Sequence, residues 1–440
     1  MTQEIPVAEF VKWFRDSSPY INAHRGRTFV LAIDGDTLRS PEATGLVHDI
    51  ALLASLGVRL VLVHGAEPQI EARLAERGLE LDRVNGFPVV DPGALACARE
   101  AVGGLRIDIE ARFSTGLSGT PMAGTAIRLV SGNLVVARPI GIRNGVDHLH
   151  SGEVRRIRTA TIRDLLGDGA LVLLSPIGCS PTGEAFLLDT GDVATAAAIQ
   201  LQADKLLLVS GEPPLTDSAD ERIGELTPTE AQALCDGGSC TDGLRLRIRH
   251  AVRACRGGVA RAHLLCSRHQ GALLQELYTR DGVGTLITSE RYDTLRGATI
   301  DDVGGVLQII APLEQEGILV HRSREQLELE IDNFVVMERD GMIIACAALY
   351  EFPPEHAAEL ACVGVHPDYR NADRGATLLR HLERRARSRG IERLIVLTTR
   401  TSHWFREQGF EPARIQDLPV SRQAMYNYQR NSKVFVKALG

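Results

Sequence analysis

Long apolar runs are absent from this chain of 440 residues. No run approaches the roughly 20 apolar residues that a membrane-spanning helix needs, and residues 1–20 lack the basic-then-apolar pattern of a secretion signal. We therefore expect a cytoplasmic protein with no membrane partner. Apolar residues such as Val7 and Phe14 are spaced for one side of a helix instead. This helix should pack on its own domain or dock on a neighbouring subunit.

Cysteines at the spacing of a metal site or a redox motif are also missing. The eight cysteines form no C-x-x-C pair, and no group of Cys and His has the spacing of a zinc site. Most of them lie in apolar runs, where cysteine behaves as a small hydrophobic residue. This usage indicates a reducing compartment and predicts no metal.

An excess of positive charge is lacking as well, since the formal net charge is −7. Five arginines gather in residues 380–389, but no aromatic side chains lie between them. A solvated helix face explains such a cluster better than nucleic-acid binding does. Nucleic acid is therefore not an expected partner.

The chain is long enough for two or three domains. Buried apolar strands such as Phe29–Ile33 and Arg59–Val63 alternate with helices such as Glu42–Ser55 up to about residue 287. This alternation predicts an α/β/α sandwich around a largely parallel sheet. We expect the first domain to span residues 1–285, a linker to span 286–295 and a second domain to span 296–440.

From Arg296 onward the pattern changes to helices mixed with hairpin strands. Phe334–Met337 and Ile343–Leu349 flank a turn with Gly341, as in a β-hairpin. Ala298–Ile300 also has the character of a strand. The second domain is therefore predicted to be α+β, with helices on a mostly antiparallel sheet.

The segment Val365–Leu379 is the most informative part of the chain. It contains a strand, a polar loop with Arg370 and Arg374, and then an amphipathic helix. The first turn of a helix presents free backbone N–H groups and the positive end of the helix dipole, which suit a pyrophosphate. An anion site at this loop is the functional prediction, and a solvated strand-to-helix turn is the structural alternative.

The order of elements after Arg296 resembles the Gcn5-related N-acetyltransferase fold. The phosphate loop of that family is R/Q-x-x-G-x-G/A, and this chain has Arg370-x-x-Asp373-x-Gly375, with aspartate in place of the first glycine. The whole chain more closely resembles the bacterial N-acetylglutamate synthases of arginine biosynthesis, in which an amino-acid-kinase-like domain precedes the acetyltransferase domain. The segments that carry this resemblance are Pro19–Gly26, Leu273–Gly284, Ile318–Gln326, Cys346–Tyr350, Leu397–Phe405 and Tyr426–Arg430.

This resemblance implies an enzyme that transfers acetyl from acetyl-CoA to the α-amino group of L-glutamate. It also implies inhibition by L-arginine and a homo-oligomer, a hexamer in this family. Glu359 matches the catalytic base, while Arg322, Arg430 and Thr398 match the residues that bind glutamate. Arginine forks suit the two carboxylates of that substrate. The residues that match the acetyl-CoA site are Cys362, Val363, Val365, Arg370, Asp373, Arg374, Gly375 and Ala376.

Backbone N–H groups of the strand that ends at Val365 would polarise the thioester carbonyl. That strand is expected to splay from its neighbour and open a slot for the cofactor. Many acetyltransferases place a tyrosine before the last Gly-Phe to protonate the departing thiolate. Here the matching residue is Phe405, so another group or water must supply the proton.

The first domain resembles N-acetylglutamate kinase with a departure that matters. Kinases of this type carry a lysine where this chain has Ala32, and carboxylates stand in the two phosphate turns, at Asp34 and Glu67. Phosphoryl transfer depends on positioned positive charge, so we predict no kinase activity. Asp192 matches a kinase carboxylate but is equally explained as a helix-start aspartate. The residues that match the arginine site of sensitive relatives are Tyr20, His263, Glu276 and Gly284.

Two other functions stay open at this stage. The chain could be an N-acetylglutamate kinase or a bifunctional synthase and kinase, which a coupled ATP assay would reveal. It could also be an arginine-sensing module whose acetyltransferase domain is inactive or modifies protein lysines. Release of coenzyme A with free glutamate, rather than with a lysine peptide, would separate these functions.

Overall fold

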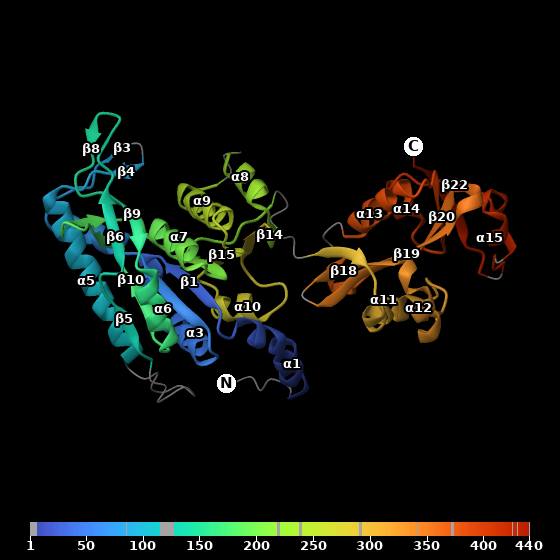
Figure 1. The fold of residues 1–440 in the computed structure, drawn as a ribbon, viewed down its shortest axis with the longest axis horizontal. Helices are drawn as coiled ribbons and strands as arrows, with labels where there is room; N and C mark the ends of the chain where they lie inside the picture. Colours follow the sequence, from blue (N-terminus) through green and yellow to red (C-terminus); the bar gives the residue numbers. More distant parts are fainter. Residues whose placement is uncertain are drawn as a thin grey trace. The chain divides into compact units, whose positions relative to one another are not determined.

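The computed structural model describes residues 7–84, 86–114, 127–217, 221–236, 240–289, 293–339, 341–370, 374–424, 426–428 and 430–439. The chain divides into two compact units, Met1–Glu290 and Arg291–Gly440. Figure 1 colours them from blue to yellow and from yellow to red. Each unit is described by itself.

The first unit is built on an eight-stranded sheet. Its neighbouring strands are parallel except β15 and β16, which are antiparallel. The central strands are buried along nearly their whole length because helices cover both faces. The spatial order is β14 (Glu225–Leu226), β16 (Thr285–Thr288), β15 (Arg261–Cys266), β13 (Lys205–Ser210), β1 (Thr28–Ile33), β2 (Arg59–His64), β10 (Leu171–Leu174) and β5 (Leu129–Ser131).

Two apolar clusters lie on the two faces of this sheet, which makes the unit an α/β/α sandwich (Figure 1). The helices on one face are α3 (Ala43–Ser55), α4 (Glu67–Glu76), α5 (Pro92–Ser114) and α10 (Ala272–Tyr278). The helices on the other are α6 (Thr159–Gly167), α7 (Thr190–Leu201), α8 (Pro228–Asp236) and α9 (Asp242–Arg256). The amino-terminal helix α1 (Val7–His24) packs against α10.

Smaller elements complete the first unit. Helix α2 (Gly35–Arg39) begins after Asp34, whose carboxylate caps it by accepting a hydrogen bond from the backbone N–H of Thr37. A four-stranded sheet has the order β12 (Ala185–Leu187), β11 (Ile177–Cys179), β6 (Val135–Pro139) and β9 (Gly152–Ile157). The hairpins are β3 (Arg83–Val84) with β4 (Phe87–Pro88), and β7 (Ile142–Arg143) with β8 (Val146–Asp147).

The second unit is built on a seven-stranded sheet whose pairs are antiparallel, except β20 with β21. The spatial order is β17 (Thr294–Gly297), β18 (Phe334–Arg339), β19 (Met342–Phe352), β20 (Ala357–Val365), β21 (Arg393–Thr398), β23 (Lys433–Ala438) and β22 (Glu411–Ala413). The predicted hairpin corresponds to β18 and β19. The strand predicted at Ala298–Ile300 is wrong, because β17 ends at Gly297 and the 3-10 turn η1 (Ile300–Asp302) follows.

Helices cover both faces of this sheet too. Apolar residues of α13 (Arg374–Ser388) and α14 (Ser402–Glu407) pack on one face, and those of α11 (Val303–Gln315) and α12 (Arg324–Glu330) pack on the other. The short helix α15 (Val420–Ala424) lies between β22 and β23 in sequence. The remaining turns are η2 (Ile331–Asn333), η3 (Pro353–Glu355), η4 (Pro367–Tyr369) and η5 (Ile415–Asp417).

Strands β20 and β21 separate part-way along their length. Their pairing runs from Ala357 to Glu359, and within the described residues β20 continues to Val365 without β21 beside it. The register of β20 against β19 also shifts in this region, and Cys362 has a positive φ of 52°. The predicted splay is therefore present.

All eight cysteines are free thiols. Across the described ranges, no helix combines the length and apolar character needed to cross a membrane.

Candidate active site

A cavity of about 560 Å³ lies where β20 and β21 part. Backbone and side chains of β20 form one wall, the start of α13 forms another, and Trp404 and Phe405 of α14 close a third side. Backbone N–H groups of β20 on the β21 side have no strand partner beyond Glu359 in the described part of the chain. Of the residues predicted to bind acetyl-CoA, those that line the cavity are Cys362, Val363, Val365, Arg370, Gly375 and Ala376.

The two loop arginines have different surroundings. Arg370 lines the cavity, is exposed, and donates from Nε to the carbonyl oxygen of Val365 at 3.4 Å. Arg374 instead donates from Nε to Asp293 at 2.8 Å, and its guanidinium lies over the ring of Tyr369 at 5.2 Å. The guanidinium of Arg374 is therefore engaged by protein groups, and Arg374 is not among the residues that line the cavity. Asp373 lies outside the described residues.

Glu359 is the last residue of β20 that pairs with β21. Its carboxylate, 11% exposed, accepts two hydrogen bonds from Arg422 of α15. Nε of Arg422 donates to Oε2 at 2.5 Å and Nη2 donates to Oε1 at 3.1 Å. The candidate base is thus held by an arginine that the sequence did not single out.

Arg322 is fixed by a small polar network. Tyr350 donates its hydroxyl proton to Glu330 at 2.5 Å, and Arg322 interacts with both. Burial opposes the charged guanidinium, but the neighbouring Cys362, Tyr350 and Glu330 raise the pKa of Arg322. Its Nε is buried and has no hydrogen-bond partner among the described residues. An unpaired buried donor is costly, so this N–H group suits a carboxylate ligand.

Arg430 lies close enough to Arg322 for the charge of Arg322 to affect the pKa of Arg430. Burial and then the charge of Arg322 lower the pKa of Arg430. Its Nη2 donates to the carbonyl oxygen of Ile318. Two guanidinium groups that repel each other at one site favour an anion between them.

Cys362 lines the cavity and lies near both Arg322 and Glu359. Burial raises the pKa of its thiol to about 11, while Arg322 acts in the opposite direction and Glu359 adds to the rise. The thiol is therefore neutral and lies within the electrostatic reach of both the predicted base and a predicted substrate arginine. Thr398 lines the same cavity, but its hydroxyl contacts the hydroxyl of Thr401 at 2.8 Å and accepts from its backbone N–H at 3.1 Å.

In the first unit, the structure brings His263, Glu276 and Gly284 together. Glu276 pairs through Oε1 with Nδ1 of His263 at 2.6 Å, and Oε2 accepts the backbone N–H groups of Val283 and Gly284 at 2.8 Å each. Burial would raise the pKa of Glu276, but these hydrogen bonds hold it at about 2. Its carboxylate therefore supports the loop before β16, besides any contact it makes with an effector.

Tyr20 lies on α1 beside the same region. Its ring centroid is 6.4 Å from that of His24, and His24 is 5.6 Å from Tyr278 at the end of α10. His24 also forms a 2.8 Å hydrogen bond from Nε2 to the carbonyl oxygen of Leu277. Burial lowers the pKa of His24 to about 4, so this ring is neutral at pH 7 and donates.

The two former phosphate turns are occupied by the chain's own carboxylates. Asp34 accepts the backbone N–H groups of Thr37 at 2.8 Å and Gly211 at 3.2 Å. Glu67 accepts from the backbone N–H of Ala66 at 3.2 Å and the hydroxyl of Thr190 at 3.1 Å, and burial raises its pKa. Backbone N–H groups in and beside these two turns are thus already bound by the chain's own carboxyl groups.

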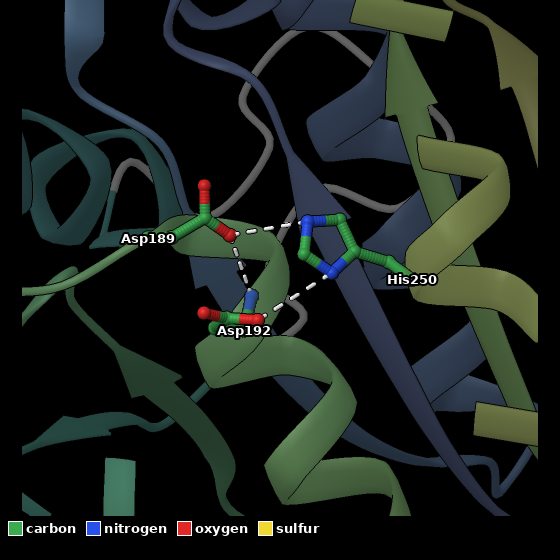
Figure 2. Close-up of side chains that lie close together, drawn as sticks. All are labelled: Asp189, Asp192 and His250. Carbon is green, nitrogen blue, oxygen red and sulfur yellow. Dashed lines mark hydrogen bonds and ion pairs between the residues drawn. The ribbon is translucent and has the colours of Figure 1, made fainter. Parts of the chain in front are cut away.

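Asp192, which matches a kinase carboxylate, belongs to a cluster with Asp189 and His250 (Figure 2). Nε2 of His250 is 3.2 Å from Asp189 and Nδ1 is 3.7 Å from Asp192. Three such ligands, two carboxylates and one imidazole, could attract a cation. However, Arg253 already donates to Asp192 at 2.5 Å, and Asp189 caps α7 by accepting the N–H of Asp192 at 2.7 Å. These contacts account for the cluster as polar contacts between the start of α7 and α9, with one ion pair between Asp192 and Arg253.

Family models match both units. The amino acid kinase family model matches residues 27–266, and the acetyltransferase (GNAT) family model matches residues 305–410. An amino-acid acetyltransferase of Pseudomonas fluorescens strain Pf-5 is 54% identical over 433 residues, which are 98% of this chain and 100% of the relative. One of Azotobacter vinelandii is 54% identical over 432 residues, with the same shares. The chain belongs to the amino-acid acetyltransferase family.

Solved structures agree with this membership. The N-acetylglutamate synthase from Neisseria gonorrhoeae complexed with coenzyme A and L-arginine is 38% identical to this amino-acid acetyltransferase, with a TM-score of 0.85 over 98% of this chain and 99% of that one. The same enzyme complexed with coenzyme A and N-acetyl-glutamate has a TM-score of 0.62 at the same identity and coverage. The predicted family, the two-part fold and the enzyme class are therefore confirmed.

Sequence reasoning missed several residues of the site. The resemblance included Tyr350 and Trp404 without giving either a role, and it did not include Glu330 or Arg422. Tyr350 and Glu330 are 20 residues apart and meet only through the sheet. Arg422 pairs with a residue 63 positions earlier. In the sequence, the one signal was that Glu359 is a carboxylate among apolar strand residues and therefore needs a partner.

Proposed function

We propose that this amino-acid acetyltransferase transfers the acetyl group of acetyl-CoA to the α-amino group of L-glutamate, giving N-acetyl-L-glutamate and coenzyme A. This is the first step of arginine biosynthesis. The observation that carries the choice of glutamate is the pair of nearby guanidinium groups, Arg322 and Arg430, with the buried Nε of Arg322 left without a partner. A substrate with two carboxylates matches such a pair.

The geometry supports a direct transfer. Acetyl-CoA would occupy the cavity between β20 and β21, with its pyrophosphate at Arg370 and the start of α13. Free N–H groups of β20 would donate to the thioester carbonyl oxygen, which becomes negative in the transition state. Glu359 would take a proton from the substrate ammonium, directly or through a water. The amine lone pair then forms the C–N bond, and the C–S bond breaks as coenzyme A leaves as thiolate. The nitrogen passes its second proton to the thiolate, directly or through water, which gives the neutral amide and the thiol.

Thiol release from acetyl-CoA tests this function. The purified chain is assayed with each of the twenty amino acids and with a lysine peptide. We expect release with L-glutamate, weaker release with L-aspartate, which is one methylene shorter, and none with the peptide. Release that is equal across neutral amino acids, or that needs the peptide, would overturn the proposal.

We also propose that L-arginine inhibits the enzyme by binding the first unit at Tyr20, His263, Glu276 and Gly284. The support is the junction of α1 with α10 and the loop before β16, where an effector could bias the position of a terminal helix. Inhibition requires unequal affinity for two states of the protein. Tyr20→Ala should shift the inhibitory concentration of L-arginine upward, compared with Arg15→Ala at an exposed site on the same helix. Equal inhibition of both variants and wild type would remove Tyr20 from the site.

A homo-oligomer, a hexamer by resemblance, and a cytoplasmic location belong to the same proposal. The exposed Trp13 and Phe14 on α1 support docking of this helix on another subunit. The eight free thiols support a reducing compartment. Sedimentation equilibrium would test the homo-oligomer, because Trp13→Asp should lower the molar mass relative to wild type if α1 docks on another subunit.

A further inference from the structure

Arg422 holds the carboxylate of Glu359, and this contact sets the orientation of the proposed base. Arg422 donates every hydrogen bond that the Glu359 carboxylate accepts within the described residues. A glutamate side chain has three rotatable bonds, so a base without a partner would sample several positions. Here one planar guanidinium contacts both oxygens and fixes the plane of the carboxylate.

This fork leaves acceptor positions on both carboxylate oxygens unused by the described residues. Each carboxylate oxygen can accept two hydrogen bonds, and Arg422 uses one on each, at 2.5 and 3.1 Å. A substrate ammonium or a water could use the remaining acceptor positions, next to Leu360, which lines the cavity. The contact therefore orients the Glu359 carboxylate and leaves one acceptor position on each oxygen unused by Arg422.

Arg422 is itself anchored, although α15 has only five residues. Leu418 and Tyr426 flank this helix, and both are buried in one apolar cluster with Ala357 of β20. Tyr426 also donates its hydroxyl proton to the carbonyl oxygen of Ser432 at 2.7 Å. The cluster that holds α15 thus also holds the strand that carries Glu359.

The segment between β22 and β23, which contains α15, also contains Arg430, eight positions after Arg422. Arg430 donates to the carbonyl oxygen of Ile318, which lines the cavity. One segment therefore presents a guanidinium to the base and another to the proposed glutamate site. Displacing this segment would disturb proton transfer and substrate binding together.

We propose that Arg422 is a positioning residue that aims the Glu359 carboxylate at the substrate amine through its two-point contact. This inference rests on the proposed function, because it takes Glu359 as the base for acetylation of glutamate. Arg422 acts through Glu359, so the effects of changing the two residues must overlap. A residue that acts alone would give independent effects.

A double-mutant cycle tests this overlap. The full-length variants are Arg422→Gln, Arg422→Lys, Glu359→Gln and the double variant, with Arg406→Gln at an exposed position of α14 as the matched control. We expect Arg422→Gln to lower kcat roughly 10-fold or more, because small misplacements of a reacting group are costly. The KM for acetyl-CoA should stay within about twofold. Arg422→Lys should recover part of kcat, since it keeps one charged donor.

The double variant decides the case. If Arg422 works by aiming Glu359, the kcat of the double variant should equal that of Glu359→Gln within about twofold. It also removes the problem that Arg422→Gln leaves a mostly buried carboxylate unpaired, which can cost stability. Near-ultraviolet circular dichroism of each variant confirms that the fold is kept.

Three outcomes overturn the inference. Arg422→Gln could keep full kcat, the two losses could multiply in the double variant, or Arg422→Gln could raise only the KM for glutamate. The last result would make Arg422 a ligand of a substrate carboxylate instead. A failure of the proposed function looks different, because Glu359→Gln or wild type on glutamate would then depart from expectation before Arg422 is changed.

Discussion

Gly375 packs directly against the indole ring of Trp404. A Cβ atom built on Gly375 would lie 3.2 Å from Cζ2 of Trp404, closer than an ordinary contact. Both residues line the cavity at the start of α13. This position therefore allows a close approach of backbone, ring and ligand that a larger residue would prevent.

Gly375→Val should raise the KM for acetyl-CoA strongly or abolish activity. The added isopropyl group must displace Trp404 or fill the cavity, and we expect a loss of roughly 10-fold or more in kcat/KM. Gly375→Ala should have a smaller effect of the same kind. Steady-state kinetics at saturating glutamate measure both, with Arg380→Ala on the exposed side of α13 as control. Wild-type kinetics for Gly375→Val would remove this loop from the cofactor site.

Arg322→Ala and Arg430→Ala should mainly weaken glutamate binding. Each removes a charged donor proposed to meet a substrate carboxylate, so the KM for glutamate should rise about 10-fold or more. The KM for acetyl-CoA should change little, because neither side chain is expected at the pyrophosphate. Varying the two substrates separately distinguishes the effects. A selective rise in the KM for acetyl-CoA would contradict the assignment.

The first unit should perform no phosphoryl transfer. Ala32 supplies no positive charge, while Asp34 and Glu67 already occupy backbone donors of the former phosphate turns. We expect no acyl phosphate when the protein is incubated with ATP, Mg²⁺ and N-acetyl-L-glutamate, assayed by hydroxamate trapping. An active amino-acid kinase serves as the positive control. ATP-dependent hydroxamate from the purified protein would contradict this prediction.

His24 should make the first unit less stable as the pH falls from about 6.5 to about 4. Its pKa in the folded state is about 4, so the unfolded chain binds more protons in this range and unfolding becomes easier. The expected loss is at most about 3 kcal/mol. Burial raises the pKa of Asp49 to about 6, which acts in the opposite direction in the same range.

Comparison with His24→Gln isolates the contribution of His24. The amide of glutamine can still donate to the carbonyl oxygen of Leu277, but it does not titrate. Urea unfolding at pH 7, 6, 5 and 4 should show a smaller loss of stability in the variant than in wild type. Parallel curves for the two proteins would show that His24 is not held neutral by the fold. His403→Gln, at an exposed position, is the control.

The sequence predicted those parts of the site that are contiguous in the chain. Val365, Arg370 and Gly375 belong to one strand, loop and helix, and local patterns define each element. In the sequence, however, Arg370 and Arg374 look equivalent. Their difference comes from Asp293, 81 residues before Arg374, which takes the guanidinium away from the cavity.

Local sequence patterns could not predict the features of the site that arise from tertiary contacts. Helix α15 is too short for a hydrophobic period, so Arg422 had no structural context in the sequence. Helix α5 was also missed, because four of its nine buried residues are small, Ala94, Cys97, Ala98 and Ala101, and they interrupt the spacing of the five large apolar ones. The resemblance matched Glu276 to an effector site, but it did not reveal that His263 and two backbone N–H groups already bind this carboxylate.

A single-turnover experiment tests the central claim most directly. Enzyme in excess over acetyl-CoA is mixed with ¹⁵N-labelled L-glutamate, and N-acetyl-L-glutamate is quantified over time for wild type and Glu359→Gln. The account predicts labelled product from wild type and a rate roughly 10²-fold or more lower for the variant, since proton removal precedes attack. No labelled product from wild type, or equal rates for the two proteins, would contradict it.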